Sequence, residues 1–173
     1  MIFLEKHKTI LLLSVLLTAS YFVFFLDLTS LPIRMFDEAR LAVNAFEMSK
    51  NGNFLVTYFD GKPDMWNTKP PLTIWAMTFF MKTLGYNELA VRLPSALCAL
   101  FTTIALYFFL SGFCKNHYAA FWSTSVLITS VGFIGEHVSR TGDYDSMLVF
   151  FTFAYSISWF LFLNTENKKY LFL

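Results

Sequence analysis

The sequence predicts an all-α integral membrane protein, with a bundle of four transmembrane helices and an outer loop that carries interfacial amphipathic helices. Of its 173 residues, 56% are hydrophobic and only 14% are charged, a composition far from that of a soluble domain. Four runs contain no charged residue, and each approaches the roughly 20 residues that cross the hydrocarbon core. The net charge of +1 gives no indication of a nucleic-acid partner.

The four charge-free runs are the predicted spans, because charges are costly inside the bilayer. They cover residues 10–26, 93–114, 118–135 and 146–165. The first run follows a basic start, as in a secretory signal, but it is long for one and no small-residue cleavage site follows it. We therefore interpret it as an uncleaved first span.

The distribution of lysines predicts the orientation. With four spans, both ends of the chain and the turn near residue 115 share one side, which carries two glutamates and the lysines Lys6, Lys8, Lys115, Lys168 and Lys169. Since basic residues favour the cytoplasmic side, we predict a multi-pass protein of the inner (plasma) membrane with a cytoplasmic N-terminus. The outer side then receives the loops 27–92 and 136–145.

The long outer loop begins with a predicted amphipathic helix over residues 37–50. Its apolar positions Leu41, Ala45 and Met48 share one face, and the dipeptide Asn51-Gly52 ends it. Residues 54–59 then predict a short extended piece, and the sequence "DGKP" predicts a turn.

A second predicted helix of the outer loop covers residues 70–81. This run is too short to cross the bilayer, so we expect it to lie in the membrane interface. Pro71 suits a first-turn position, and Gly85 suits the end of the helix.

Two pairs of acids on the outer side are the candidate catalytic residues. Asp37 and Glu38 open the first amphipathic helix, where the helix dipole alone would favour them. Alternatively, one carboxylate serves as a general base that takes a proton from an acceptor hydroxyl. Asp143 and Asp145 either start the last helix or meet the first pair in one cavity. There they would orient the base or hold a divalent cation.

Cations near the same surface are candidates for phosphate binding. Lys69 lies between an aromatic residue and the interfacial helix, so it is either a snorkelling lysine or a contact for a phosphate group. Arg40, Arg92 and Arg140 are further candidates for the phosphate. His137 stands alone near the end of a span, and we interpret it as structural rather than as a metal ligand.

Four motifs together resemble glycosyltransferase family 39. They are the "DE" pair at 37–38, "KPPL" at 69–72, "NELAVRLPSAL" at 87–97 and "RTGDYDSML" at 140–148. This family includes the protein O-mannosyltransferases and the lipid A aminoarabinose transferases, integral membrane enzymes of the GT-C fold. The resemblance implies a glycosyltransferase that moves a hexose or pentose from a polyprenyl-phosphate donor to an acceptor on the extracytoplasmic face, with inversion.

The resemblance also implies roles for individual residues. Asp37 would be the catalytic base, and Glu38 would assist with donor or acceptor. Lys69 would lie near the donor phosphate, and Asp143 or Asp145 would fill the second acidic position. The acceptor is left open among a protein hydroxyl, lipid A and a glycan.

The chain departs from the family pattern in two respects. Thr68 stands where many relatives have an acid, and family members are several times longer, so we expect the N-terminal part of such an enzyme. A non-catalytic membrane fragment or a lipid-binding assembly subunit is the alternative. A transporter is disfavoured, because its ionisable groups would lie within the spans.

Overall fold

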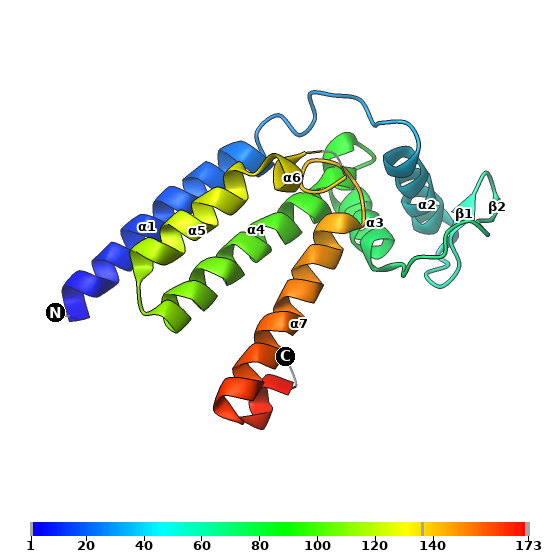
Figure 1. The fold of residues 1–173 in the computed structure, drawn as a ribbon. Helices are drawn as coiled ribbons and strands as arrows, with labels where there is room; N and C mark the ends of the chain where they lie inside the picture. The colour runs from blue at the N-terminus through cyan, green and yellow to red at the C-terminus, as the bar shows by residue number, and fades with distance from the viewer. Residues whose placement is uncertain (1, 136, 172–173) are drawn as a thin grey trace.

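The computed structural model describes residues 2–135 and 137–171 and confirms the all-α membrane class. Long helices form a bundle, and two shorter helices with a small hairpin form a separate layer at one end of it (Figure 1). The helices are α1 (Ile2–Phe24), α2 (Asp37–Asn51), α3 (Leu72–Leu84), α4 (Glu88–Cys114), α5 (His117–Thr129), α6 (Val131–Ile134) and α7 (Asp145–Thr165). The strands are β1 (Tyr58–Phe59) and β2 (Lys62–Pro63), and a 3-10 turn η1 (Lys168–Leu171) follows α7.

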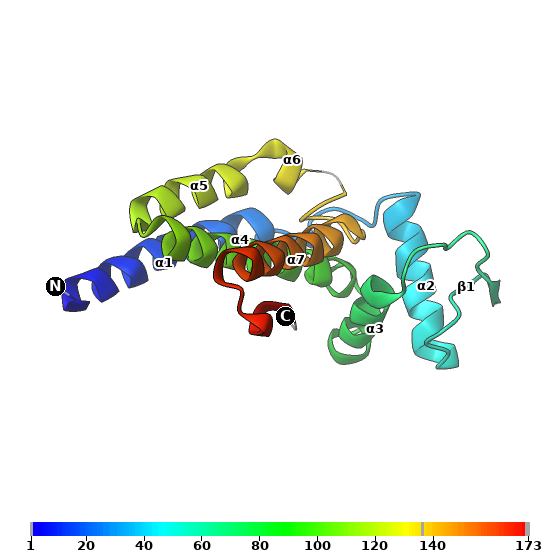
Figure 2. The same cartoon turned by 60° about the horizontal axis from the view of Figure 1, so that its bottom comes forward.

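Three helices in the described part of the chain are long and apolar enough to cross a membrane. They cover His7–Phe24, Glu88–Cys114 and Asp145–Thr165. Helices α1, α4 and α5 lie side by side, and α7 packs against α4 (Figures 1 and 2). These three helices match three of the four predicted spans.

The prediction of one continuous helix over 118–135 is wrong. Helix α5 has 13 residues and ends at Thr129, and Ser130 adopts an extended backbone before the four-residue α6 begins. Hydroxyls compete with the helical hydrogen bonds here, since Thr129 Oγ1 donates to the carbonyl of Ser125 over 2.8 Å. The four-span count and the orientation of the chain stay predictions.

The two outer helices end where the sequence predicts. Helix α2 starts at Asp37, and the amide of Gly52 closes it by donating to Met48 O over 3.1 Å. The φ of +71° at Gly52 is the left-handed geometry in which a glycine is favoured. Helix α3 begins after Pro71 and ends before Gly85.

The outer helices pack against each other and against the start of α4. The predicted apolar stripe of α2 is buried there, in a cluster of Leu41, Ala45, Met48, Ile74, Met77, Met81, Ala90 and Val91. Between α2 and α3, the predicted extended piece and turn form an antiparallel hairpin that pairs Tyr58 with Pro63. Asp60 and Gly61 at its tip both have positive φ, the combination that a type I′ hairpin turn requires.

Candidate functional site

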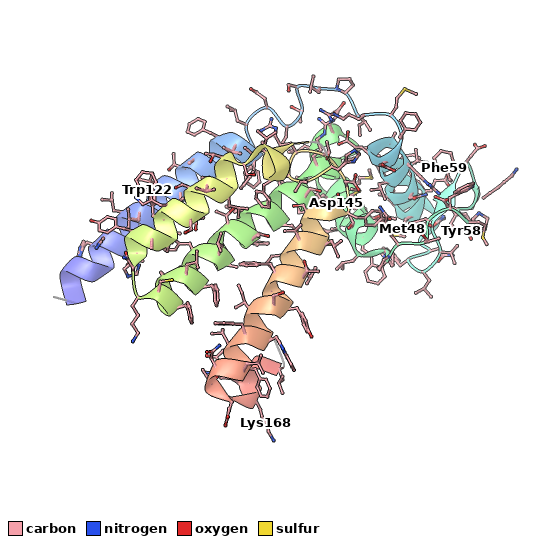
Figure 3. All side chains as sticks on the ribbon, viewed as in Figure 1. Met48, Tyr58, Phe59, Trp122, Asp145 and Lys168 are labelled. Atoms are coloured by element: carbon pink, nitrogen blue, oxygen red, sulfur yellow. The ribbon has the colours of Figure 1, made fainter. Side chains whose placement is uncertain are left out.

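The candidate site lies at the end of the bundle where α1 ends and α4 and α7 begin. Asp145 begins α7 and Lys168 lies in η1, which follows the other end of α7, so Asp145 lies far from the lysines of η1 (Figure 3). The loop before α7 meets the first turn of α2 at this end. The two acidic segments, 108 residues apart at most, therefore come together in space.

Asp37 and Asp143 are the carboxylates that the fold brings together. Asp37 is the first residue of α2 and is exposed, whereas Asp143 is 4% exposed. One ligand atom each from Asp37, His137 and Asp143 lie within 4.8 Å of one another. We call these three residues the acid–histidine cluster. Asp145 is not part of it and instead lines a neighbouring groove.

His137 holds the buried carboxylate of Asp143. Its Nδ1 lies 2.7 Å from Asp143 Oδ2, and the backbone amide of Tyr144 donates to Asp143 Oδ1 over 2.6 Å. The hydrogen bond and the charge of Asp143 raise the pKa of His137 above its usual range. His137 is therefore paired in the fold, and its interpretation as structural rather than as a metal ligand stays a prediction.

This pair predicts a pH-dependent contribution to stability. Because the pKa of His137 is raised in the folded state, the pair stabilises the protein fully below about pH 6.5, the ordinary histidine pKa, and loses this effect as the pH rises through the raised value. His137→Gln should therefore lower the unfolding midpoint more at about pH 5.5 than at about pH 9. Thermal unfolding in detergent measures this, and the pH difference should vanish when Asp143→Asn is the background. An equal loss at both pH values would contradict the pairing.

Glu38 and Arg92 form a buried ion pair beneath the cluster. Their side chains are each 3–4% exposed, and Arg92 Nε and Nη2 donate to the two carboxylate oxygens over 2.7 and 3.0 Å. The backbone amides of Arg34 and Gly142 add hydrogen bonds of 2.8 and 2.9 Å to Glu38. Burial alone would raise the pKa of Glu38, but these hydrogen bonds outweigh it and hold the pKa below its usual range.

Arg92 has no N–H left for a phosphate. Besides its two bonds to Glu38, it donates to the carbonyls of Leu28, Leu31 and Pro32 over 2.6 to 2.9 Å. These five bonds use the five N–H groups of a guanidinium. The fold thus puts Glu38 and Arg92 below the surface of the site, where they join α2, α4 and two loops.

Gly142 lets its loop lie directly on α4. A Cβ at this position would come within 2.4 Å of Val91 Cγ1 and 3.0 Å of Val91 O. The close approach is what allows the Gly142 amide to reach Glu38. The positions of Asp143 and of the ion pair are therefore linked through one short piece of backbone.

Asp37 lines two depressions, and a third adjoins them. A narrow polar cavity of about 70 Å³ is lined by Asp37, Arg40, Leu41, Asn44, Trp66, Asn67, Thr68, Lys69, Asp143 and Tyr144. On one side it shares Asp37, Arg40 and Trp66 with an aromatic groove of about 660 Å³, which also has Phe36 and Phe59. On the other side it shares Lys69 and Tyr144 with an apolar groove of about 350 Å³, lined by Leu72, Met147, Leu148 and Phe151.

Lys69 stands where the polar cavity meets the apolar groove. Its Nζ lies 4.6 Å from the centre of the Tyr144 ring, a cation–π contact. The Tyr144 hydroxyl donates to Asn67 Oδ1 over 3.0 Å, and burial raises the pKa of Tyr144 to about 12. This tyrosine thus stays neutral and gives the lysine a fixed support.

The other predicted cations have different positions. Arg40 lines the polar cavity but is paired with Asp64 at 2.6 Å, and this hydrogen bond lowers the pKa of Asp64. Arg140 lies away from Asp37, because it donates to the carbonyls of Val23 and Leu26 at the end of α1 over 2.5 and 2.7 Å. Lys69 and Arg40 are thus the predicted phosphate contacts that line the cavity of Asp37.

The sequence did not indicate several residues of the site. Asp64, Asn67 and Tyr144 were missed, and His137 was assigned a structural role on its own. Tyr144 could have been found, because it stands between the two predicted acids in "GDYDS". Asp64 and Asn67 have no such signal, since only the folding of the outer loop brings them to α2.

The acid–histidine cluster has the donor set of a divalent cation site. Two carboxylates and one imidazole suit zinc or manganese, and three protein ligands would leave positions open for a substrate oxygen. The cluster therefore fits either a base with a hydrogen-bonded neighbour or a bound cation.

The fold and the site define a class: a helical membrane protein with an acid-rich polar cavity at one end of its candidate spans, set between an aromatic and an apolar groove. A family model described as dolichyl-phosphate-mannose-protein mannosyltransferase matches residues 68–173. Because the match covers more than half of the chain, the protein belongs to this family, and the resemblance to glycosyltransferase family 39 is confirmed. Asp37 and Glu38 lie before the matched range.

Two relatives come from Aquifex aeolicus (strain VF5), and both are described as uncharacterized proteins. One is 30% identical over 152 residues, which cover 87% of this chain and 29% of the relative. The other is 34% identical over 93 residues, which cover 50% of this chain and 21% of the relative. The chain therefore spans less than a third of the length of these relatives. No solved structure matches the chain.

Proposed function

We propose that the protein is part of a membrane glycosyltransferase that moves a sugar from a polyprenyl-phosphate donor to an acceptor, with Asp37 as the general base. The observation that carries this proposal is the position of Asp37. Its exposed carboxylate lines a polar cavity together with the ammonium group of Lys69, between two larger grooves. A base and a phosphate-binding cation on one cavity are what direct displacement at a sugar carbon needs.

The surroundings of Asp37 suit a general base. It begins α2 and is exposed, and a base must be accessible to accept a proton from an acceptor hydroxyl. Asp143 and His137 lie beside it and restrict where an acceptor hydroxyl fits. With the base on one face of the sugar and the phosphate leaving from the other, the anomeric carbon inverts without a covalent intermediate.

The two grooves suit the two substrates. An isoprenoid chain is apolar, so the groove formed by the starts of α3 and α7 suits its first units, with the phosphate at Lys69. The aromatic groove on the other side of Asp37 then receives the acceptor. Trp66 and Phe36, 83% and 87% exposed, offer flat faces there for a sugar ring or a peptide. A protein hydroxyl, lipid A and a glycan all remain candidate acceptors.

We assign Glu38 and Arg92 a positioning role in place of direct contact with substrate. Their ion pair joins α2 to the loop that carries Asp143, so it fixes the distance between the two acids. The predicted role of Arg92 at the donor phosphate is replaced by this one, because its N–H groups are all used within the protein.

A bound divalent cation is the second candidate for the cluster. Asp37, His137 and Asp143 would hold it, and it would polarise the acceptor hydroxyl. A direct binding measurement distinguishes the two candidates. If the cluster is a cation site, the wild type binds Mn²⁺ or Zn²⁺ and His137→Ala loses this binding. If Asp37 acts as a general base without a cation, neither protein binds either ion.

Lys69→Ala tests the donor side of the proposal. The loss of a charge-assisted contact of about 1.5–3 kcal/mol should raise the KM for a polyprenyl-phosphate sugar roughly 10- to 100-fold. The measurement is transfer by membranes that express the full-length polypeptide, with donor concentration varied. Lys82→Ala, a basic residue on α3, should leave this KM within about twofold. An unchanged KM in Lys69→Ala would contradict the assignment of Lys69 to the donor site. If the protein is instead a lipid-binding subunit without turnover, the membranes should show no transfer at all.

A further inference from the structure

Residues 64–69 carry Lys69 from the hairpin toward α3 along an irregular path, and we call them the lysine segment. They follow β2 and include one turn, where Met65 and Trp66 are 85% and 83% exposed. Lys69 at the end of the segment is exposed as well. Because so little of the segment is packed into the interior, its position depends on a few side-chain contacts.

Asp64 fixes the start of the lysine segment to α2. Its side chain is 4% exposed, and Arg40 Nη2 and Asn44 Nδ2 donate to its carboxylate oxygens over 2.6 and 3.1 Å. Both donors belong to α2, the helix that begins with Asp37. The start of the segment is therefore held by the helix that carries the proposed base. Lys69 comes later in the segment, so this contact alone does not fix its ammonium group.

Tyr144 makes a second contact with the lysine segment, from the loop that carries Asp143. The Tyr144 hydroxyl donates to Asn67 Oδ1 over 3.0 Å, and the centre of its ring lies 4.6 Å from Lys69 Nζ. Tyr144 directly follows Asp143 in the chain and lines both the polar cavity and the apolar groove. The lysine segment is thus held from both of the elements that supply the acids of the cavity.

The two contacts of Tyr144 constrain the lysine segment to different degrees. A cation–π contact tolerates any position of the ammonium group within about 6 Å of the ring centre. A hydrogen bond requires a narrow range of distance and angle. The bond to Asn67 is therefore the contact that fixes where this end of the segment lies. The ring attracts the lysine, and the hydroxyl determines its place.

We propose that Tyr144 is a positioning residue, whose hydrogen bond to Asn67 fixes the place of the Lys69 ammonium group relative to the acids of the cavity. The proposal rests on the proposed function, in which the phosphate leaves toward Lys69 while Asp37 acts from the opposite face of the sugar. A lysine out of place still attracts the phosphate but does not hold it in line with the attacking hydroxyl. Since a displacement of about 1 Å can cost roughly 100-fold in rate, the Tyr144 hydroxyl should matter more for turnover than for donor binding.

Tyr144→Phe and Tyr144→Leu separate the two contacts. Phenylalanine keeps the ring and loses the hydroxyl, so kcat should fall about 10-fold while the KM for the donor stays within about twofold. Leucine removes the ring as well, so this KM should also rise roughly 3- to 30-fold. The measurement is transfer from a polyprenyl-phosphate sugar by membranes that express the full-length polypeptide, with donor concentration varied. Rates are given per folded protein, so that a loss of stability is not counted as a loss of turnover.

Tyr86→Phe is the matched control for the loss of a hydroxyl. The Tyr86 hydroxyl accepts a hydrogen bond from Ser49 Oγ over 3.2 Å, away from the polar cavity, so this change should leave kcat and KM within about twofold. Asn67→Ala removes the acceptor of the same hydrogen bond that Tyr144→Phe breaks. The double variant Tyr144→Phe/Asn67→Ala should therefore be no slower than Asn67→Ala alone, and losses that simply multiply would overturn the proposed coupling.

Backbone hydrogen exchange tests the contact without any transfer assay. The amides of Asn67 and Lys69 donate within the lysine segment, to Asp64 O over 3.3 Å and to Asn67 Oδ1 over 3.4 Å. In the purified full-length polypeptide, Tyr144→Phe should speed their exchange at least about threefold, and Tyr86→Phe should not. An unchanged exchange rate or an unchanged kcat in Tyr144→Phe would overturn the positioning role. No transfer by the wild type would instead contradict the proposed function, and the exchange rate would then decide alone whether Tyr144 holds the lysine segment.

Discussion

Asp37→Asn is expected to lower sugar transfer by about 10²- to 10⁴-fold, the usual contribution of a general base. The amide has the shape of the carboxylate but cannot accept the proton of an acceptor hydroxyl. Because Asp37 is exposed at the start of α2, the loss should come without a large change in stability. The measurement is transfer from a polyprenyl-phosphate sugar by membranes that express the full-length polypeptide, together with the unfolding midpoint of the variant.

Asp60→Asn is the matched control for this prediction. Asp60 is an exposed aspartate in the hairpin turn, with a φ of 54° that asparagine also adopts readily. The same chemical change there should leave transfer within about twofold. Full activity in Asp37→Asn would remove Asp37 from the role of base and favour a non-catalytic membrane component.

Glu38→Gln is expected to destabilise the protein by about 3–5 kcal/mol, as usually follows when one partner of a buried ion pair is removed. The change leaves the guanidinium of Arg92 buried without a counter-charge and weakens the bonds from the amides of Arg34 and Gly142. Thermal unfolding in detergent measures the loss. The double variant Glu38→Gln/Arg92→Gln should lose less than the sum of the two single variants, because it removes both charges.

The Arg40–Asp64 pair is the control for burial. It has a comparable N–O distance of 2.6 Å, but the Arg40 side chain is 35% exposed, so Arg40→Gln should cost at most about 1 kcal/mol. The contribution of the Glu38–Arg92 pair to stability should also depend on pH. Because the pKa of Glu38 is lowered in the folded state, this contribution should persist above the ordinary pKa near 4.5 and disappear as the pH falls through the lowered value. A cost for Glu38→Gln no larger than that for Arg40→Gln would contradict the central role of the buried pair.

Local signals explain why the outer helices were predicted well. Acids at 37–38 and Gly52 mark the two ends of α2, and Pro71 and Gly85 mark those of α3. Such signals act within a few residues, so the sequence around each end is enough. The break at Ser130 has no comparably strong signal, because serine and threonine are common in spanning helices and apolar character alone predicted a continuous run.

The sequence predicted which segments of the chain would meet at the site, but not the roles of their individual side chains. The predicted four-span topology put the two acidic loops on one side of the bundle, and Asp37 and Asp143 do lie close together in the structure. The sequence did not tell the roles of adjacent acids apart, because helical geometry turns neighbouring side chains about 100° from each other. Only the packed structure shows Glu38 turned inward to Arg92, 54 residues away, and Arg140 turned to α1. Contacts of such long range depend on how the helices pack, which no local motif specifies.

The first turn of α2 combines an anchor and the proposed general base in consecutive residues. Glu38 is fixed by four hydrogen bonds from three different segments of the chain, and Asp37 precedes it by one peptide bond. No flexible stretch separates them, so a displacement of the anchor by a fraction of an ångström reaches the exposed carboxylate almost undiminished. We therefore expect changes in the interior that displace Glu38 to displace Asp37 as well, even where they lie far from the cavity.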